Sequence, residues 1–188
     1  KGDKKTDITS KDEMDAILLE LDKAEFSVAD VKKGERTKKA PLPFTTSTLQ
    51  QEASKTLNFS TQKTMRIAQQ LYEGVELKGQ GTVGIITYLR TDSTRVSDEA
   101  VIASKNYIST NYGEQYAAEL AAEKKNGKKI QDAHEAIRPT DIANTPAAMK
   151  ESLSRDQFRL YQLIWKRFVA SRMTNANYET TSVKIDAN

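Results

Sequence analysis

The chain has 188 residues, of which 29% are charged and 37% hydrophobic, a balance that excludes an intrinsically disordered protein. Its 29 basic and 26 acidic side chains give a formal charge of only +3, so any binding of nucleic acid must depend on local patches. The absence of cysteine excludes disulfides and thiolate metal sites. No apolar run approaches the roughly 20 residues needed to span a bilayer.

The first part of the sequence predicts a helix followed by a strand. Ser10 and Glu13 have the spacing of a capping box and precede apolar residues at helical intervals. Alternating apolar side chains from Phe26 to Val31 then predict a strand. We interpret the basic, polar residues 32–39 as a linker and place a domain boundary after it. The first residues also lack the apolar segment of a signal peptide, so we expect a cytoplasmic protein.

The middle of the chain is predicted to be mostly helical. Five helices are expected, with N-caps at Ser47, Ser60, Ser97, Thr145 and Ser154. The last of them carries an aromatic stripe at spacings of three and four, formed by Phe158, Tyr161, Trp165 and Phe168. We interpret this stripe as core rather than as a platform for stacking bases, because stacking aromatics usually lie on sheets or loops. The β-branched residues from Tyr178 to Ile185 predict a final strand.

A short apolar run ends in two residues whose chemistry suits attack on a phosphodiester. Residues 83–87 predict a buried strand, and in an extended chain Tyr88 and Arg90 would point to the same side. Tyrosine, with a pKa of about 10, is a poor nucleophile unless the phenolate or the phosphoryl charge is stabilised, and the planar donors of arginine can do either. The alternative is that Tyr88 is a half-buried strand aromatic and Arg90 its solvated neighbour.

Longer motifs decide between these alternatives. Residues 86–93, with the sequence ITYLRTDS, resemble the active-site tyrosine motif of type IA DNA topoisomerases, and residues 132–140, DAHEAIRPT, resemble the second signature of that family. Residues 43–54 and 64–74 resemble the helices that precede the tyrosine in the same enzymes. Leu89 stands where the topoisomerase I branch usually has methionine and topoisomerase III usually has proline. The HEAIRP form of the second motif favours the topoisomerase I branch.

The resemblance implies a mainly α, multidomain α+β fragment. In the family, a helical domain that carries the tyrosine hangs from a curved, β-rich domain that forms part of an arch around DNA. We therefore expect residues 42–173 to be the tyrosine domain. Residues 1–41 and 174–188 would be parts of the arch domain.

The resemblance also implies roles for individual side chains. Tyr88 would attack single-stranded DNA and keep its 5′ side as a phosphotyrosine ester, while Arg90 would bind the scissile phosphate. His134, the only histidine, would contact the same phosphate region, although a structural role is the alternative. If its segment is helical, Arg138 would share a face with His134 and serve DNA positioning or a local ion pair. Asp92 would contact DNA and orient Arg90, or cap the following turn.

The family also needs Mg²⁺, for which the sequence offers no Asp-x-Asp-x-Glu arrangement. We expect the ion to be bound by an N-terminal domain absent from this chain, and no metal in the chain itself. The chain would then be an excised fragment that neither relaxes supercoils nor cleaves DNA efficiently alone. A cationic loop with Lys124, Lys125, Lys128 and Lys129 is either solvated or in contact with phosphate. The alternatives are topoisomerase III, a reverse gyrase, or a non-enzymatic helical DNA-binding module in which Tyr88 is structural.

Overall fold

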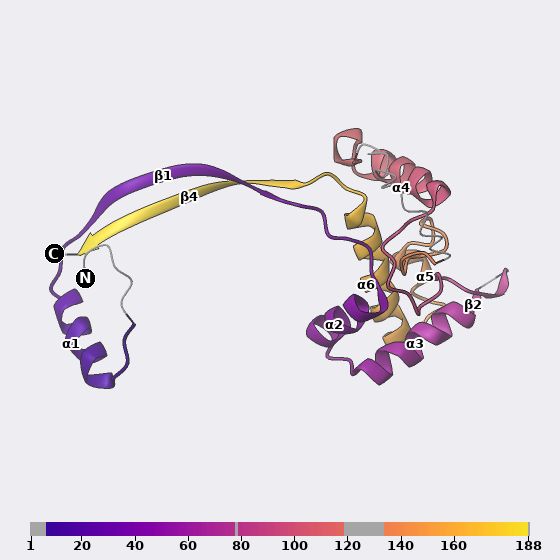
Figure 1. The fold of residues 1–188 in the computed structure, drawn as a ribbon, viewed down its shortest axis with the longest axis horizontal. Helices are drawn as coiled ribbons and strands as arrows, with labels where there is room; N and C mark the ends of the chain where they lie inside the picture. The colour runs from indigo at the N-terminus through magenta and orange to yellow at the C-terminus, as the bar shows by residue number, and fades with distance from the viewer. Residues whose placement is uncertain (1–6, 78, 119–133, 188) are drawn as a thin grey trace. The chain divides into compact units, whose positions relative to one another are not determined.

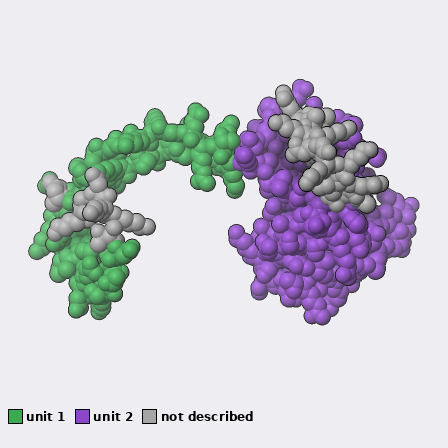
Figure 2. Space-filling model, viewed as in Figure 1, with its two compact units in different colours: residues 1–38, 177–188 green, residues 39–176 purple. Residues whose placement is uncertain are grey.

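A computed structural model of the chain describes residues 7–77, 79–118 and 134–187. It contains both helices and strands, so its fold class is α+β (Figure 1). Two compact units are present, residues 1–38 with 177–188, and residues 39–176 (Figure 2). The chain is divided after residues 38 and 176, whereas the sequence predicted domain boundaries after residues 41 and 173. That the first unit belongs to a β-rich arch domain stays a prediction.

The first unit consists of one helix and a two-stranded sheet. Helix α1 (Lys11–Leu21) begins at the predicted cap, because the Ser10 hydroxyl accepts a hydrogen bond from the Glu13 N–H. Strand β1 (Phe26–Lys38) pairs with β4 (Ala176–Ala187). The predicted linker over residues 32–39 is therefore wrong, since all but its last residue belongs to β1. Both strands are exposed along their whole length, and polar side chains fit such a strand as well as a loop.

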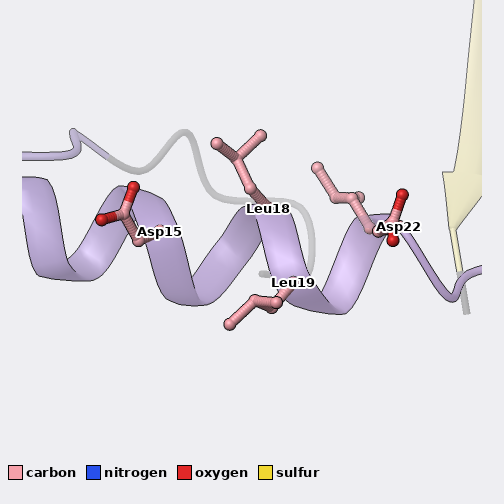
Figure 3. Close-up of a pocket in the computed structure, with 5 residues that line it drawn as sticks. Asp15, Leu18, Leu19 and Asp22 are labelled. Atoms are coloured by element: carbon pink, nitrogen blue, oxygen red, sulfur yellow. The ribbon is translucent and has the colours of Figure 1, made fainter.

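Most apolar side chains of helix α1 are exposed. A hollow of about 670 Å³ lies against the helix and is lined by Asp15, Leu18, Leu19, Leu21 and Asp22 (Figure 3). These residues all belong to α1 or to its C-cap, Asp22, and none of the helix residues is buried. The described part of the first unit therefore does not cover its own apolar surface.

The second unit holds the remaining helices. They are α2 (Thr46–Leu57), α3 (Thr61–Glu73), α4 (Asp98–Asn111), the 3₁₀ turn η1 (Glu114–Tyr116), α5 (Pro146–Met149) and α6 (Arg155–Ser171). Four predicted N-caps are confirmed, at Ser60, Ser97, Thr145 and Ser154. The cap of α2 is Thr45 rather than Ser47, because Thr45 and Thr48 bond to each other's backbone N–H in a reciprocal box.

Helix α6 packs against α2, α3 and α5 and carries the centre of the core. Tyr161, Trp165 and Phe168 are buried and Phe158 is partly buried, which confirms that the aromatic stripe is core. The Trp165 indole N–H donates to the Ile142 carbonyl at 3.0 Å, so the buried polar atom of this ring is satisfied.

Short extended segments connect the helices near Tyr88. Strands β2 (Val75–Leu77) and β3 (Gly81–Val83) form an antiparallel hairpin. The strand predicted over residues 83–87 is only partly present: β3 ends at Val83, and Ile86 makes an isolated antiparallel bridge to Pro139. The bridge is held by hydrogen bonds of the flanking residues, from the Thr87 N–H to the Arg138 carbonyl and from the Thr140 N–H to the Ile85 carbonyl, so it does not need the N–H that Pro139 lacks.

Candidate functional site

Hydrogen bonds from two directions hold the segment that carries Tyr88. On one side, the Ile85 N–H donates to the Leu71 carbonyl at 2.9 Å. On the other, the Thr87 N–H donates to the Arg138 carbonyl at 2.9 Å, and the Thr87 hydroxyl donates to the Ala136 carbonyl at 2.7 Å. The segment is thus tied both to the end of α3 and to the residues that follow His134.

Burial alternates along the motif, as expected for an extended backbone. Leu89 is 1% exposed, whereas its neighbour Tyr88 is 40% exposed, and Arg90 and Asp92 are exposed as well. The buried residues Leu89 and Thr91 fix the backbone to the core. The phenol and the guanidinium are consequently presented to solvent.

Three aromatic rings from distant segments meet at Tyr88. The Tyr88 and His134 rings stack with their centroids 5.8 Å apart and an interplanar angle of 29°. Tyr72, from the last turn of α3, approaches Tyr88 in an edge arrangement at 5.4 Å and 67°. The structure thus brings together the predicted residues Tyr88 and His134 and adds Tyr72. Tyr72 is 38% exposed, while Leu71 beside it is buried.

The side chains of Arg90 and Asp92 are not joined by an ion pair in the described part of the chain. Among the described residues, the Asp92 side chain makes no hydrogen bond that would cap the next turn, and it is the Thr91 hydroxyl that accepts from the Ser93 N–H, at 3.0 Å. Neither predicted local role of Asp92 is observed, and its contact with DNA stays a prediction. Among the described residues, Arg90 has no acidic partner, so its donors face solvent.

Arg138, in contrast, is engaged in several interactions. Its side chain is 12% exposed and lies 2.8 Å from the Glu135 carboxylate. It also donates to the Pro139 carbonyl at 2.9 Å and to the Ser97 hydroxyl at 3.3 Å. This is the local ion pair that the sequence offered as one of two roles for Arg138, and its contact with DNA stays a prediction.

The segment from His134 to Thr140 is extended, so the expected helical face shared by His134 and Arg138 does not exist. Its backbone is drawn into two isolated antiparallel bridges, Phe44 with Ile137 and Ile86 with Pro139. These bridges satisfy the backbone groups that a helix would have used. His134 and Arg138 make separate contacts there: the His134 ring stacks on Tyr88, whereas the Arg138 guanidinium pairs with Glu135.

Residues 1–188 match the model of a family described as DNA topoisomerase. The chain belongs to the type IA DNA topoisomerases. It is similar to the solved structure of full-length topoisomerase I from Thermotoga maritima, with 43% sequence identity and a TM-score of 0.77 over 96% of this chain. The match covers 28% of the Thermotoga maritima chain. The family resemblance that the motifs indicated is thereby confirmed.

Glu135 makes the stability of this topoisomerase chain depend on pH. Burial by itself would raise the pKa of the Glu135 carboxyl, but the hydrogen bond and charge of Arg138, with smaller contributions from the Ser97 N–H and Arg95, lower the pKa below its usual value. A carboxyl with a lowered pKa stabilises the folded state above its unfolded pKa of 4.5, and this contribution disappears as pH falls through the folded pKa.

We therefore expect Glu135→Gln to lower the free energy of unfolding by about 1–2 kcal/mol at neutral pH, because Arg138 loses its charged partner. The difference from the unsubstituted chain should shrink below about pH 4.5. Urea unfolding followed by circular dichroism across this range would measure it. Glu114→Gln, at an exposed position, is the matched control. A difference that stays constant with pH would contradict the ion-pair explanation.

A metal site is not evident in the described residues of this topoisomerase chain. They contain no group of three or more histidine, cysteine or acidic side chains that could hold an ion. The location of the Mg²⁺ site stays a prediction. The predicted lysine loop, with Lys124, Lys125, Lys128 and Lys129, lies outside the described residues. No helix within residues 7–77, 79–118 and 134–187 is long and apolar enough to cross a membrane.

Proposed function

We propose that the chain is the tyrosine-bearing part of a bacterial topoisomerase I that cleaves one DNA strand, allows strand passage and reseals the break, thereby relaxing negative supercoils. The observation that carries the proposal is the exposed Tyr88, set between Tyr72 and His134. Arg90, two residues away, has no acidic partner among the described residues. The 43% identity to a topoisomerase I supports this branch over topoisomerase III or a reverse gyrase. We place the enzyme in the cytoplasm.

In the proposed reaction the Tyr88 oxygen attacks a phosphorus atom of single-stranded DNA. A bond from this oxygen to phosphorus forms, the bond from phosphorus to the 3′ oxygen breaks, and the phenol proton is released as the 3′ hydroxyl gains one. The DNA then carries a 5′-phosphotyrosine link. Because one phosphodiester replaces another, the 3′ hydroxyl can reverse the step without ATP.

Arg90 and His134 would act on the phosphate during this exchange. The guanidinium of Arg90 has no acidic partner among the described residues, so its planar donors can bind the non-bridging oxygens and stabilise the charge that develops on them. The exposed His134 ring, stacked on Tyr88, lies close enough to the nucleophile to contact the same phosphate. Mg²⁺, which we assign to an N-terminal domain of the same enzyme, would supply further positive charge.

Mapping the covalent adduct tests the proposal directly. The complete enzyme is incubated with a labelled single-stranded oligonucleotide, denatured and digested with trypsin. Cleavage after Lys78 and Arg90 yields peptide 79–90, in which Tyr88 is the only tyrosine. We expect the nucleotide label on this peptide. Label confined to another tyrosine peptide would reject Tyr88 as the nucleophile.

The 188-residue chain alone is expected to leave a negatively supercoiled plasmid unrelaxed in the presence of Mg²⁺, because the metal-binding part of the proposed site lies elsewhere. Addition of the separate Mg²⁺-binding domain should restore formation of the covalent adduct. The same mixture made with a Tyr88→Phe chain is the control. Relaxation by the isolated chain, measured on an agarose gel, would show that its own residues complete the site.

A further inference from the structure

We propose that Tyr72 is a positioning residue for Tyr88, whose ring it holds in the orientation from which the phenol oxygen attacks. The inference rests on the proposed function of Tyr88 as the nucleophile. Tyr72 lies 16 positions before Tyr88 in the sequence, in the last turn of α3, and its ring contacts the Tyr88 ring.

The backbone of Tyr72 is fixed against the segment that carries Tyr88. The Leu71 carbonyl accepts a hydrogen bond from the Ile85 N–H at 2.9 Å. The Tyr72 carbonyl oxygen lies so close to Gly84 that a Cβ atom there would overlap it. Leu71, fully buried, anchors this end of the helix in the core. The end of α3 and the Tyr88 segment therefore cannot shift independently.

The Tyr88 side chain itself has few constraints. It is 40% exposed, and none of the described residues makes a hydrogen bond to its hydroxyl. Its ring contacts with other aromatic residues are those with Tyr72 at 5.4 Å and His134 at 5.8 Å, both within the separation that favours aromatic pairs. Without Tyr72, one of the two rings that limit rotation of the phenol would be lost. Small misplacements of a reacting group are costly in rate.

A purely structural role explains the position of Tyr72 less well. Its ring is 38% exposed, and its side chain makes no hydrogen bond within the described part of the chain. The adjacent Leu71 already fills the core beneath the helix. The ring contact that remains for Tyr72 is the one with Tyr88.

The test compares Tyr72→Leu and Tyr72→Phe in the complete enzyme. We expect Tyr72→Leu to slow single-turnover formation of the covalent adduct by about fivefold to tenfold at saturating single-stranded oligonucleotide. Tyr72→Phe, which keeps the ring, should stay within about twofold of the unsubstituted enzyme. The Kd for the same oligonucleotide, measured in a Tyr88→Phe background, should be unchanged by Tyr72→Leu. Tyr112→Leu is the matched control, because Tyr112 is 47% exposed and its ring pairs with Tyr107 at 6.4 Å.

Three results would overturn the inference. An unchanged adduct rate for Tyr72→Leu would show that the ring does not position Tyr88. A Kd weakened by Tyr72→Leu, with the adduct rate restored at saturating oligonucleotide, would show that Tyr72 contacts the nucleotide instead. A Tyr72→Leu enzyme that does not fold, by circular dichroism, would show that the ring serves the core. Failure of the proposed function is seen separately, as an adduct that survives Tyr88→Phe.

Discussion

A Tyr88→Phe enzyme is expected to form no covalent complex with single-stranded DNA, a loss of at least about a thousandfold in adduct formation. Phenylalanine keeps the ring that stacks on His134 and meets Tyr72, so the surroundings of the site are preserved. It lacks only the oxygen that would attack phosphorus. Denaturing electrophoresis of a reaction with a labelled oligonucleotide measures the adduct, and relaxation of a negatively supercoiled plasmid measures the complete cycle.

The interpretation of this loss depends on DNA binding. Because the ring and Arg90 are both retained, the Kd of the Tyr88→Phe enzyme for the oligonucleotide should stay within about twofold of the unsubstituted value. Tyr112→Phe, which removes an exposed phenol elsewhere in the same unit, should have no effect on the adduct. An adduct that persists in Tyr88→Phe would mean that another residue is the nucleophile, and Tyr88 would then be an exposed structural aromatic.

Local signals explain why the helices could be predicted from the sequence. Hydroxyl residues such as Ser60 and Ser154 accept a backbone N–H three positions later, an interaction that needs no distant partner. The aromatic stripe of α6 likewise indicates a buried face through its own spacing. The exception is α2, whose N-cap lies two residues earlier than predicted, because Thr45 and Thr48 form a capping box in place of Ser47.

The extended segments depend on distant partners and were predicted less well. Residues 32–38 are strand because β4 pairs with β1, although their own composition indicates a linker. The His134 segment is extended because Phe44 and Ile86 bridge to it. The helical face predicted for this segment was inferred from the local spacing of His134 and Arg138 alone. The long-range bridges determine the conformation instead. The same reasoning applies to Tyr72, whose contact with Tyr88 follows from the packing of α3 beside Gly84 and could not be read from its helical position.

Replacing Arg90 by alanine is expected to slow formation of the covalent adduct by about a hundredfold or more, the cost of losing a preorganised donor to transition-state charge. The expectation rests on a contrast between two arginines. Arg138 already donates to Glu135, Pro139 and Ser97, so its guanidinium is committed to the fold. Arg90 is exposed and has no acidic partner among the described residues, which leaves its donors for a phosphate.

Two further substitutions separate the geometry of Arg90 from its charge. Arg90→Lys keeps the positive charge but loses the planar fork, so we expect a rate between those of the alanine variant and the unsubstituted enzyme. Arg66→Ala removes an exposed arginine from the middle of α3 and should leave the adduct rate unchanged. Single-turnover rates at saturating oligonucleotide measure all three. If Arg90→Ala weakened binding without slowing the saturated rate, Arg90 would hold the DNA equally before and during the reaction. The group that stabilises the transition state would then have to be another one, such as His134 beside the phenol.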